Sequence, residues 1–190
     1  MLKGRVLSVA SECVPLIKTG GLADVVGALP GALAPLGWDM RVMIPAYRAL
    51  RPMLEGWSEV WTETNLWGGT GTVFQGEVAG MTVLALDAPH LFDREGGPYN
   101  GPGGDWWDNP QRFAALSWVA AEVARHGIDG WKADVLHAHD WQAGLAPAYL
   151  AYGGGGGGGG GVPPPQISLL RVAPPRPVPP LPPPPPPCPP

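Results

Sequence analysis

The sequence predicts an α/β fold with a mainly parallel β-sheet, on three observations. A nearly continuous apolar run over 5–11 leads through a glycine turn into a helical pattern over 23–36. A second apolar run, 40–44, follows, so roughly 40 residues make one strand–helix–strand unit. Near the end of the varied sequence, another short strand over 134–137 precedes a helix over 143–152. Strands that alternate with helices are typical of α/β proteins with a parallel sheet.

The first strand and helix show the expected patterns. The run 5–11 is apolar on both faces, as in a strand buried inside a parallel sheet. The helix presents one apolar side, made by Leu22, Val25, Val26, Leu29 and Leu33. Pro30 within it predicts a kink or a second helix start, and Gly37 predicts the helix end.

The middle of the chain predicts short strands and a long loop. The strands are expected over 58–64, 71–78 and 81–87, the last two forming a hairpin. Residues 88–107, rich in glycine, proline, aspartate and tryptophan, form a loop long enough to indicate a functional segment. Asp108, Asn109 and Pro110 then predict a helix start with an Asx cap, and that helix ends near Gly127.

Composition divides the chain into two parts. Residues 1–152 mix apolar and polar side chains, include all nine tryptophans, and suffice for one domain with a hydrophobic core. Residues 153–190 begin with nine consecutive glycines and hold 16 of the 26 prolines after Val162. Such a low-complexity tail buries too little apolar surface to offset its ordering entropy, so we expect 153–190 to be disordered.

Charge and cysteine content limit the possible partners and the cellular compartment of the protein. Residues 1–152 carry ten basic and 16 acidic side chains, a net charge near −6, which argues against nucleic acid as a partner. Cys13 and Cys188 are unsuited to pair, which fits a reducing compartment. The N-terminus has no signal-peptide pattern and the chain no transmembrane stretch. We therefore expect a soluble cytoplasmic protein without membrane partners.

An anion site is predicted where the first strand meets the first helix. The segment Lys18-Thr19-Gly20-Gly21 combines a lysine, a glycine turn and the N-terminus of a helix. Free N–H groups and the positive dipole end of a helix attract phosphate, and glycines let the backbone come close to it. The alternative is that the two glycines serve only the turn.

Two histidines follow the last predicted strand. His137 and His139 have the spacing of metal ligands, because alternate residues of a strand point the same way, but no further ligand cluster completes the set. The alternative is structural, with one histidine at the helix start and the other packed. In the long loop, Trp106 and Trp107 are compatible with stacking on a sugar.

Four ordered motifs together resemble the N-terminal domain of bacterial glycogen synthases, the ADP-glucose-dependent family shared with plant starch synthases. They are Ser11-Glu12 with Lys18 to Val25, Asp87 to Arg94 with Pro98-Tyr99, Asp108-Asn109 with Arg112-Phe113, and His137 to Leu145. The resemblance implies one Rossmann-like domain of a two-domain type-B glycosyltransferase. It implies an enzyme that transfers glucose from ADP-glucose to the non-reducing end of an α-1,4-glucan such as glycogen, with retention and without a metal or other cofactor.

The resemblance also implies roles for residues around the donor. Lys18 contacts the donor phosphates, Gly20 and Gly21 let the backbone approach the nucleotide sugar, and Asp24 lies near the site on the first helix. We expect Lys18 and His139 to project from neighbouring strand tips into a common crevice.

The catalytic residues implied by the resemblance are His139 and Asp108. His139 would hold the transferred glucose and favour the oxocarbenium-like transition state, while Asp108 and Asn109 would shape the acceptor side. The chemistry is then mostly positioning and electrostatic stabilisation of a leaving diphosphate.

The resemblance stops after Tyr152, where the glycine run begins. We expect a truncated chain, as after a frameshift, that is inactive alone and leaves the sheet edge beside the last strand exposed. The alternative is a non-catalytic glucan- or nucleotide-binding fragment whose proline-rich tail binds a partner domain through Pro-x-x-Pro spacing, as at Pro177 and Pro180.

Overall fold

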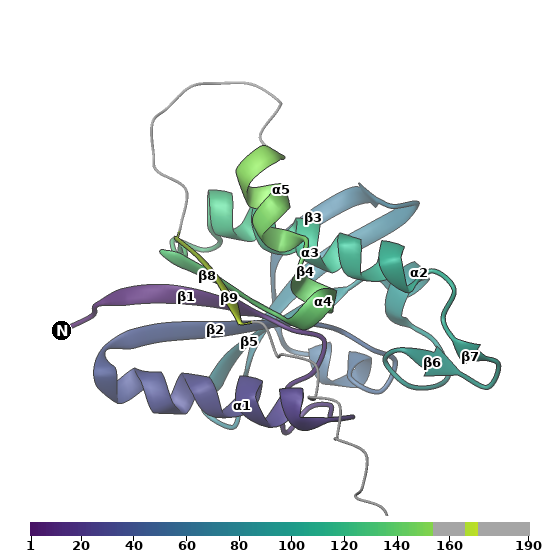
Figure 1. The fold of residues 1–190 in the computed structure, drawn as a ribbon, viewed down its shortest axis with the longest axis horizontal. Helices are drawn as coiled ribbons and strands as arrows, with labels where there is room; N and C mark the ends of the chain where they lie inside the picture. Colours follow the sequence, from purple (N-terminus) through teal and green to yellow (C-terminus); the bar gives the residue numbers. More distant parts are fainter. Residues whose placement is uncertain (154–165, 171–190) are drawn as a thin grey trace, which may run out of the picture.

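The computed structural model describes residues 1–153 and 166–170 and has an α/β fold around one seven-stranded sheet (Figure 1). The sheet order is β3-β4-β5-β2-β1-β8-β9. Its strands are β1 (Gly4–Val9), β2 (Trp38–Pro45), β3 (Ser58–Leu66), β4 (Gly69–Val78), β5 (Met81–Asp87), β8 (Val135–His139) and β9 (Gln166–Leu170). The strands from β5 to β9 pair in parallel, and β4 and β3 extend the sheet antiparallel. The predicted mainly parallel sheet is therefore confirmed.

Helices cover both faces of this sheet. The helical segments are α1 (Gly21–Leu33), η1 (Ala34–Leu36), η2 (Arg51–Leu54), α2 (Pro89–Phe92), α3 (Asn109–His126), α4 (Asp140–Ala143) and α5 (Ala146–Tyr152). Helix α1 lies on one face, and α3, α4 and α5 lie on the other (Figure 1). The core between these layers includes Leu7, Val9 and Leu136, none of which has exposed surface.

Helix α1 differs from its expected bounds. It begins at Gly21 and continues through the buried Pro30, so the second start expected at Pro30 is wrong. A proline inside a helix lacks an N–H and its ring crowds the carbonyl four residues earlier, but the carbonyl of Pro30 still accepts the N–H of Ala34. The chain then tightens into η1 and ends at Gly37, whose left-handed φ of 87° favours glycine.

The segment 88–107 is more ordered than the loop expected from its composition. It contains α2 and a small separate hairpin of β6 (Asn100–Gly101) and β7 (Gly104–Asp105). The buried Arg112 of α3 reaches into it and donates to the carbonyls of Leu91 and Pro98. Asp108 precedes α3, but its side chain makes no capping hydrogen bond, which corrects the expected Asx cap.

The end of the described chain also differs from expectation. Strand β8 reaches His139, and the single helix expected over 143–152 is two helices separated at Gly144 and Leu145. Gln166–Leu170, expected to be disordered, forms β9 parallel to β8 and covers the edge expected to be exposed. This short segment is free of proline, so it keeps the N–H groups that a strand needs. The rest of the predicted tail lies outside the described residues.

Candidate functional site

A cavity of about 470 Å³ lies beyond the C-terminal ends of β1 and β8. Its walls come from the turn after β1, from the segment between β5 and α3, and from the start of α4. The lining residues are Glu12, Gly20, Gly21, Leu22, Val25, Tyr99, Asp140 and Gln142. Ligands of open α/β sheets bind at this edge, so the topology and the cavity agree. The predicted residues Gly20 and Gly21 are part of it.

The two glycines of this cavity face open space. Gly20 has an extended φ of −146°, so the turn itself does not demand glycine there. A Cβ atom added to either Gly20 or Gly21 would meet nothing within 4 Å. Neither glycine is therefore required by packing within the described chain. Because these glycines have no side chains, the backbone at the N-terminus of α1 stays accessible. Unpaired N–H groups and the helix dipole favour an anion there.

Glu12 organises the turn that carries these glycines. Its carboxylate accepts hydrogen bonds from the Thr19 backbone N–H, from Thr19 Oγ1 at 2.6 Å and from the Gly20 N–H at 3.2 Å. Burial opposes ionisation of Glu12, but these bonds and one from Tyr99 outweigh it and lower its pKa. Because Glu12 already uses the Thr19 and Gly20 N–H groups, an incoming anion would meet the N–H groups of α1 from Gly21 onward.

Tyr99 forms part of the cavity wall. Its hydroxyl lies 2.5 Å from Glu12 Oε1 and 2.7 Å from Ser11 Oγ, and burial raises its pKa. Asn109 Nδ2 donates to the Tyr99 carbonyl at 2.9 Å. The predicted residue Asn109 therefore lies behind the wall and holds Tyr99. Sequence reasoning assigned no role to Glu12 or Tyr99, although an acidic residue directly at a strand tip was a usable signal.

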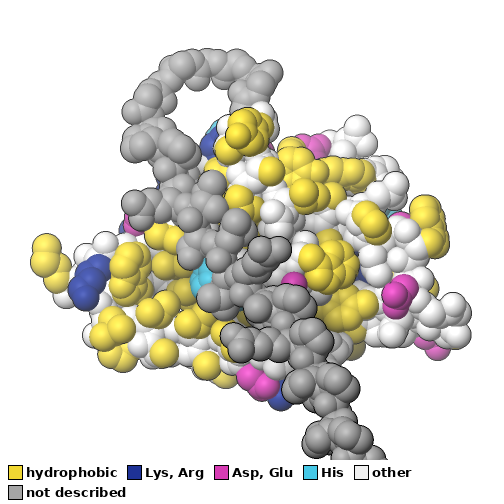
Figure 2. Space-filling view, in the orientation of Figure 1, with side chains coloured by type: hydrophobic (Ala, Val, Ile, Leu, Met, Phe, Trp, Pro, Cys, Tyr) yellow, Lys and Arg dark blue, Asp and Glu magenta, His cyan; other side chains and the backbone are white. Residues whose placement is uncertain are grey.

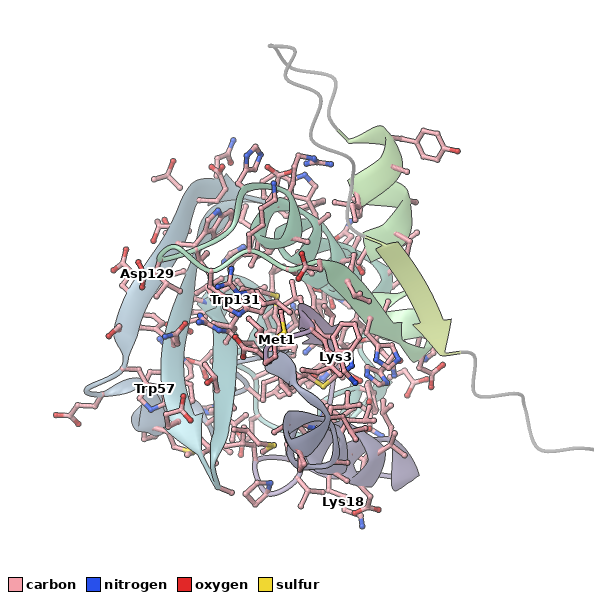
Figure 3. All side chains as sticks on the ribbon, turned by 90° about the vertical axis from the view of Figure 1, so that its left-hand side faces the viewer. Met1, Lys3, Lys18, Trp57, Asp129 and Trp131 are labelled. Atoms are coloured by element: carbon pink, nitrogen blue, oxygen red, sulfur yellow. The ribbon has the colours of Figure 1, made fainter. Side chains whose placement is uncertain are left out.

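Lys18 and Asp24 form an ion pair with each other at the outside of the turn. Lys18 Nζ lies 2.7 Å from the Asp24 carboxylate, and both side chains are about half exposed, at 54% and 55%. Figure 3 shows Lys18 at the periphery of the molecule, beside α1. Neither residue lines the cavity. An exposed ion pair of this kind contributes little to stability, so the ammonium of Lys18 can exchange Asp24 for another anion at small cost.

His139 lies beneath the cavity instead of in its wall. It has no exposed surface, and its Nε2 lies 3.0 Å from Ser8 Oγ on the neighbouring strand β1. The next residue, Asp140, does line the cavity and adopts a left-handed φ of 59°, which turns the chain sharply from β8 into α4. Neither Lys18 nor His139 therefore lines the cavity, so the common crevice expected for these two side chains is not formed in the free chain.

The rings of His137 and His139 lie side by side, with centroids 4.1 Å apart. Burial, followed by the nearby His137, lowers the pKa of His139 to about 4. Among residues 1–153 and 166–170, no group of three histidine, cysteine or carboxylate side chains is placed to share a metal ion. The two imidazoles therefore find no third metal ligand among the described residues.

Asp108 lies apart from the cavity lining. Both of its carboxylate oxygens accept bonds from Arg94, at 2.6 and 2.5 Å, and the residue is 6% exposed. The Arg94 bonds lower the pKa of Asp108. Asn109 Oδ1 accepts from Arg112 at 2.6 Å. The two residues predicted for the acceptor side thus tie the 88–107 segment to the start of α3.

The buried His139 predicts a loss of stability in mild acid. Its folded pKa lies below the ordinary value near 6.5, so below pH 6.5 the unfolded chain takes up a proton that the folded chain does not. The free energy of unfolding should fall by on the order of 1 kcal/mol for each pH unit from about 6.5 to 4. Urea titrations at several pH values measure this slope.

His139→Gln should flatten the slope, and His126→Gln is the matched control because the His126 side chain is 65% exposed. An equally steep slope in His139→Gln would contradict this prediction.

Comparison with known proteins places this fold among α/β glycosyltransferase domains. The family model of the starch synthase catalytic domain matches residues 5–157, slightly beyond Tyr152, where the motif resemblance stops. The chain therefore belongs to the starch synthase catalytic domain family. In the described part of the chain, no helix is long and apolar enough to cross a membrane.

Curated relatives are similar over the same region. Glycogen synthase of Cereibacter sphaeroides (strain ATCC 17025) is 72% identical over 151 residues, which cover 79% of this chain and 32% of the relative. Glycogen synthase of Roseobacter denitrificans is 58% identical over 147 residues, covering 77% and 31%. The chain thus spans about a third of the length of these relatives.

A solved structure agrees with this assignment. The catalytic domain of starch synthase IV from Arabidopsis thaliana, bound to ADP and acarbose, is similar at a TM-score of 0.59 and 26% identity. The similarity covers 78% of this chain and 30% of that one. The sheet and its covering helices are therefore a fold shared with a glycosyltransferase.

Proposed function

We propose that this chain carries the N-terminal part of a glycogen synthase. The reaction is transfer of glucose from ADP-glucose to the non-reducing end of an α-1,4-glucan with retention of configuration. The family assignment supports the class of enzyme. The observation that carries the proposal here is the cavity beside Gly20 and Gly21, whose open faces no part of the described chain fills.

The diphosphate of ADP-glucose would bind at the N-terminus of α1, although the carboxylates of Glu12 and Asp140 also line the cavity. The N-terminus of α1 supplies N–H donors and a positive dipole end, and Glu12 holds the preceding turn in place. Lys18 adds a full positive charge at the rim once it leaves Asp24. In this proposal Asp24 acts through Lys18, holding the ammonium near the site until the donor arrives.

The glucosyl group then lies toward β8. Burial lowers the pKa of His139 to about 4, so the ring is uncharged at neutral pH and is suited to hydrogen bonding with the sugar and not to general acid catalysis. Because His139 has no exposed surface in the free chain, this contact requires that donor binding uncovers the ring. Asp108 and Asn109 act indirectly, through Arg94 and Tyr99, by holding the part of the cavity wall that Tyr99 forms. The acceptor glucan approaches over that wall.

Titration with ADP-glucose tests this proposal. Lys18→Gln should weaken binding about tenfold, since one phosphate contact of a charged side chain is lost. The matched control is Lys3→Gln, which removes the same charge from an exposed lysine before β1, at the opposite end of that strand. Isothermal titration calorimetry at low salt measures both. Equal affinities of the two variants would contradict the role of Lys18.

Several expectations remain predictions within this proposal. They are independence from a metal or other cofactor, a cytoplasmic location, preference for ADP-glucose and the absence of a nucleic-acid partner. On the uncovered part of the face that Figure 2 shows, charged side chains of both signs are scattered.

A further inference from the structure

The strand β1 contains one polar side chain that its position does not explain. Ser8 lies between Leu7 and Val9 in the middle of the sheet, and all three residues have no exposed surface. Burying a hydroxyl without a hydrogen bond is costly. In the part of the chain that the structure describes, the only hydrogen bond of Ser8 Oγ joins it to His139 Nε2, at 3.0 Å.

The register of the sheet makes this bond specific. Ser8 pairs with His137 across β1 and β8, and its side chain reaches the histidine two residues further along the same face. The other ring nitrogen of His139, Nδ1, is buried and has no hydrogen-bond partner among the described residues. His139 therefore has one ring nitrogen hydrogen-bonded to Ser8 and one ring nitrogen without a partner among the described residues.

Counting protons decides which nitrogen carries the hydrogen. If His139 Nε2–H donated to Ser8, the serine proton would find no acceptor and Nδ1 would also remain unpaired. If Ser8 donates its O–H to Nε2, only the Nδ1–H is unpaired. The second arrangement leaves one buried polar group unsatisfied instead of two, and is therefore the favoured one, because each unsatisfied buried group destabilises the fold.

We propose that Ser8 is a positioning residue that fixes His139 in the Nδ1–H tautomer, which leaves an N–H donor, unpaired among the described residues, directly before the cavity-lining Asp140. The ring has no exposed surface in the free chain, so this donor reaches an oxygen of the sugar nucleotide only when binding uncovers it. Ser8 itself touches no ligand. The inference rests on the proposed function for the identity of that ligand. The tautomer itself is a property of the chain without any ligand.

Long-range ¹H–¹⁵N spectra of histidine rings at pH 7.5 test the tautomer directly. The unaltered chain should show a protonated Nδ1 and an unprotonated Nε2 at His139. Ser8→Thr keeps the hydroxyl and should preserve this pattern, whereas Ser8→Ala should populate the Nε2–H form. An Nε2–H tautomer in the unaltered chain would overturn the inference, as would an unchanged tautomer in Ser8→Ala.

Affinity provides the second readout. Ser8→Ala should weaken ADP-glucose binding about three- to tenfold, and Ser8→Thr should restore it. A changed tautomer with unchanged affinity would overturn the link between Ser8 and the ligand. Failure of the unaltered chain to bind ADP-glucose would contradict the proposed function. The tautomer inference would still be tested in that case, because the spectra are recorded without ligand.

Discussion

Arg112→Ala should lower the free energy of unfolding by about 3–5 kcal/mol. The Arg112 side chain is 1% exposed, and its guanidinium carbon lies 5.2 Å from the ring centroid of Phe92 and 5.5 Å from that of Phe113. Its guanidinium donates to the Leu91 carbonyl at 2.6 Å and to the Pro98 carbonyl at 2.9 Å. Truncation would remove this donor from both carbonyls and open a void beside the two aromatic rings.

The same change should disturb the candidate site, because Arg112 ties the segment that carries Tyr99 to α3. Arg112→Lys should be intermediate, since one ammonium cannot reproduce the planar fork that reaches separate carbonyls. Arg48→Ala is the matched control, because Arg48 is 61% exposed and its nearest carboxylate, Asp93, lies 3.6 Å away. Urea unfolding measures all three variants. A cost below about 1 kcal/mol for Arg112→Ala would contradict this account.

Most of the fold could be predicted from local pattern. The apolar run of β1 and the glycine-terminated helix after it define the strand–helix–strand unit that places the site. Strand β9 could not be predicted, because its pairing depends on the free edge of β8 and not on its own composition. The break between α4 and α5 was missed although Gly144 lies at it and Pro147 lies at the start of α5, two residues that disfavour a continuous helix.

The candidate site was predicted only in part. Gly20 and Gly21 line the cavity as expected, because their position after β1 follows from topology. The partners of Lys18 and Asp108 were not predictable, since Asp24 and Arg94 come close only through side-chain geometry. The buried Ser8 was visible in the sequence as a polar residue in an apolar strand, but its partner lies 131 residues away.

The central claim is that the donor diphosphate lies against the open backbone of Gly21 at the start of α1. Gly21→Ala places a methyl group where the structure leaves space that a ligand would fill. ADP-glucose affinity should fall at least about tenfold, because even a small displacement of a bound phosphate costs much of its binding energy. Stability should not fall, since alanine is favoured over glycine in helices by up to about 1 kcal/mol.

A matched control lies on the same helix. A Cβ atom added to Gly31 would also meet nothing within 4 Å, and this glycine is exposed but does not line the cavity. Gly31→Ala should therefore change stability in the same direction as Gly21→Ala and leave affinity untouched. Because both variants remain folded, a difference in affinity between them reports the ligand contact alone.

The most direct measurement is the dissociation constant of ADP-glucose for the Gly21→Ala and Gly31→Ala variants, taken with their free energies of unfolding. The account predicts weakened binding by Gly21→Ala alone, with both variants at least as stable as the unaltered chain. Undiminished binding by a folded Gly21→Ala variant would contradict it.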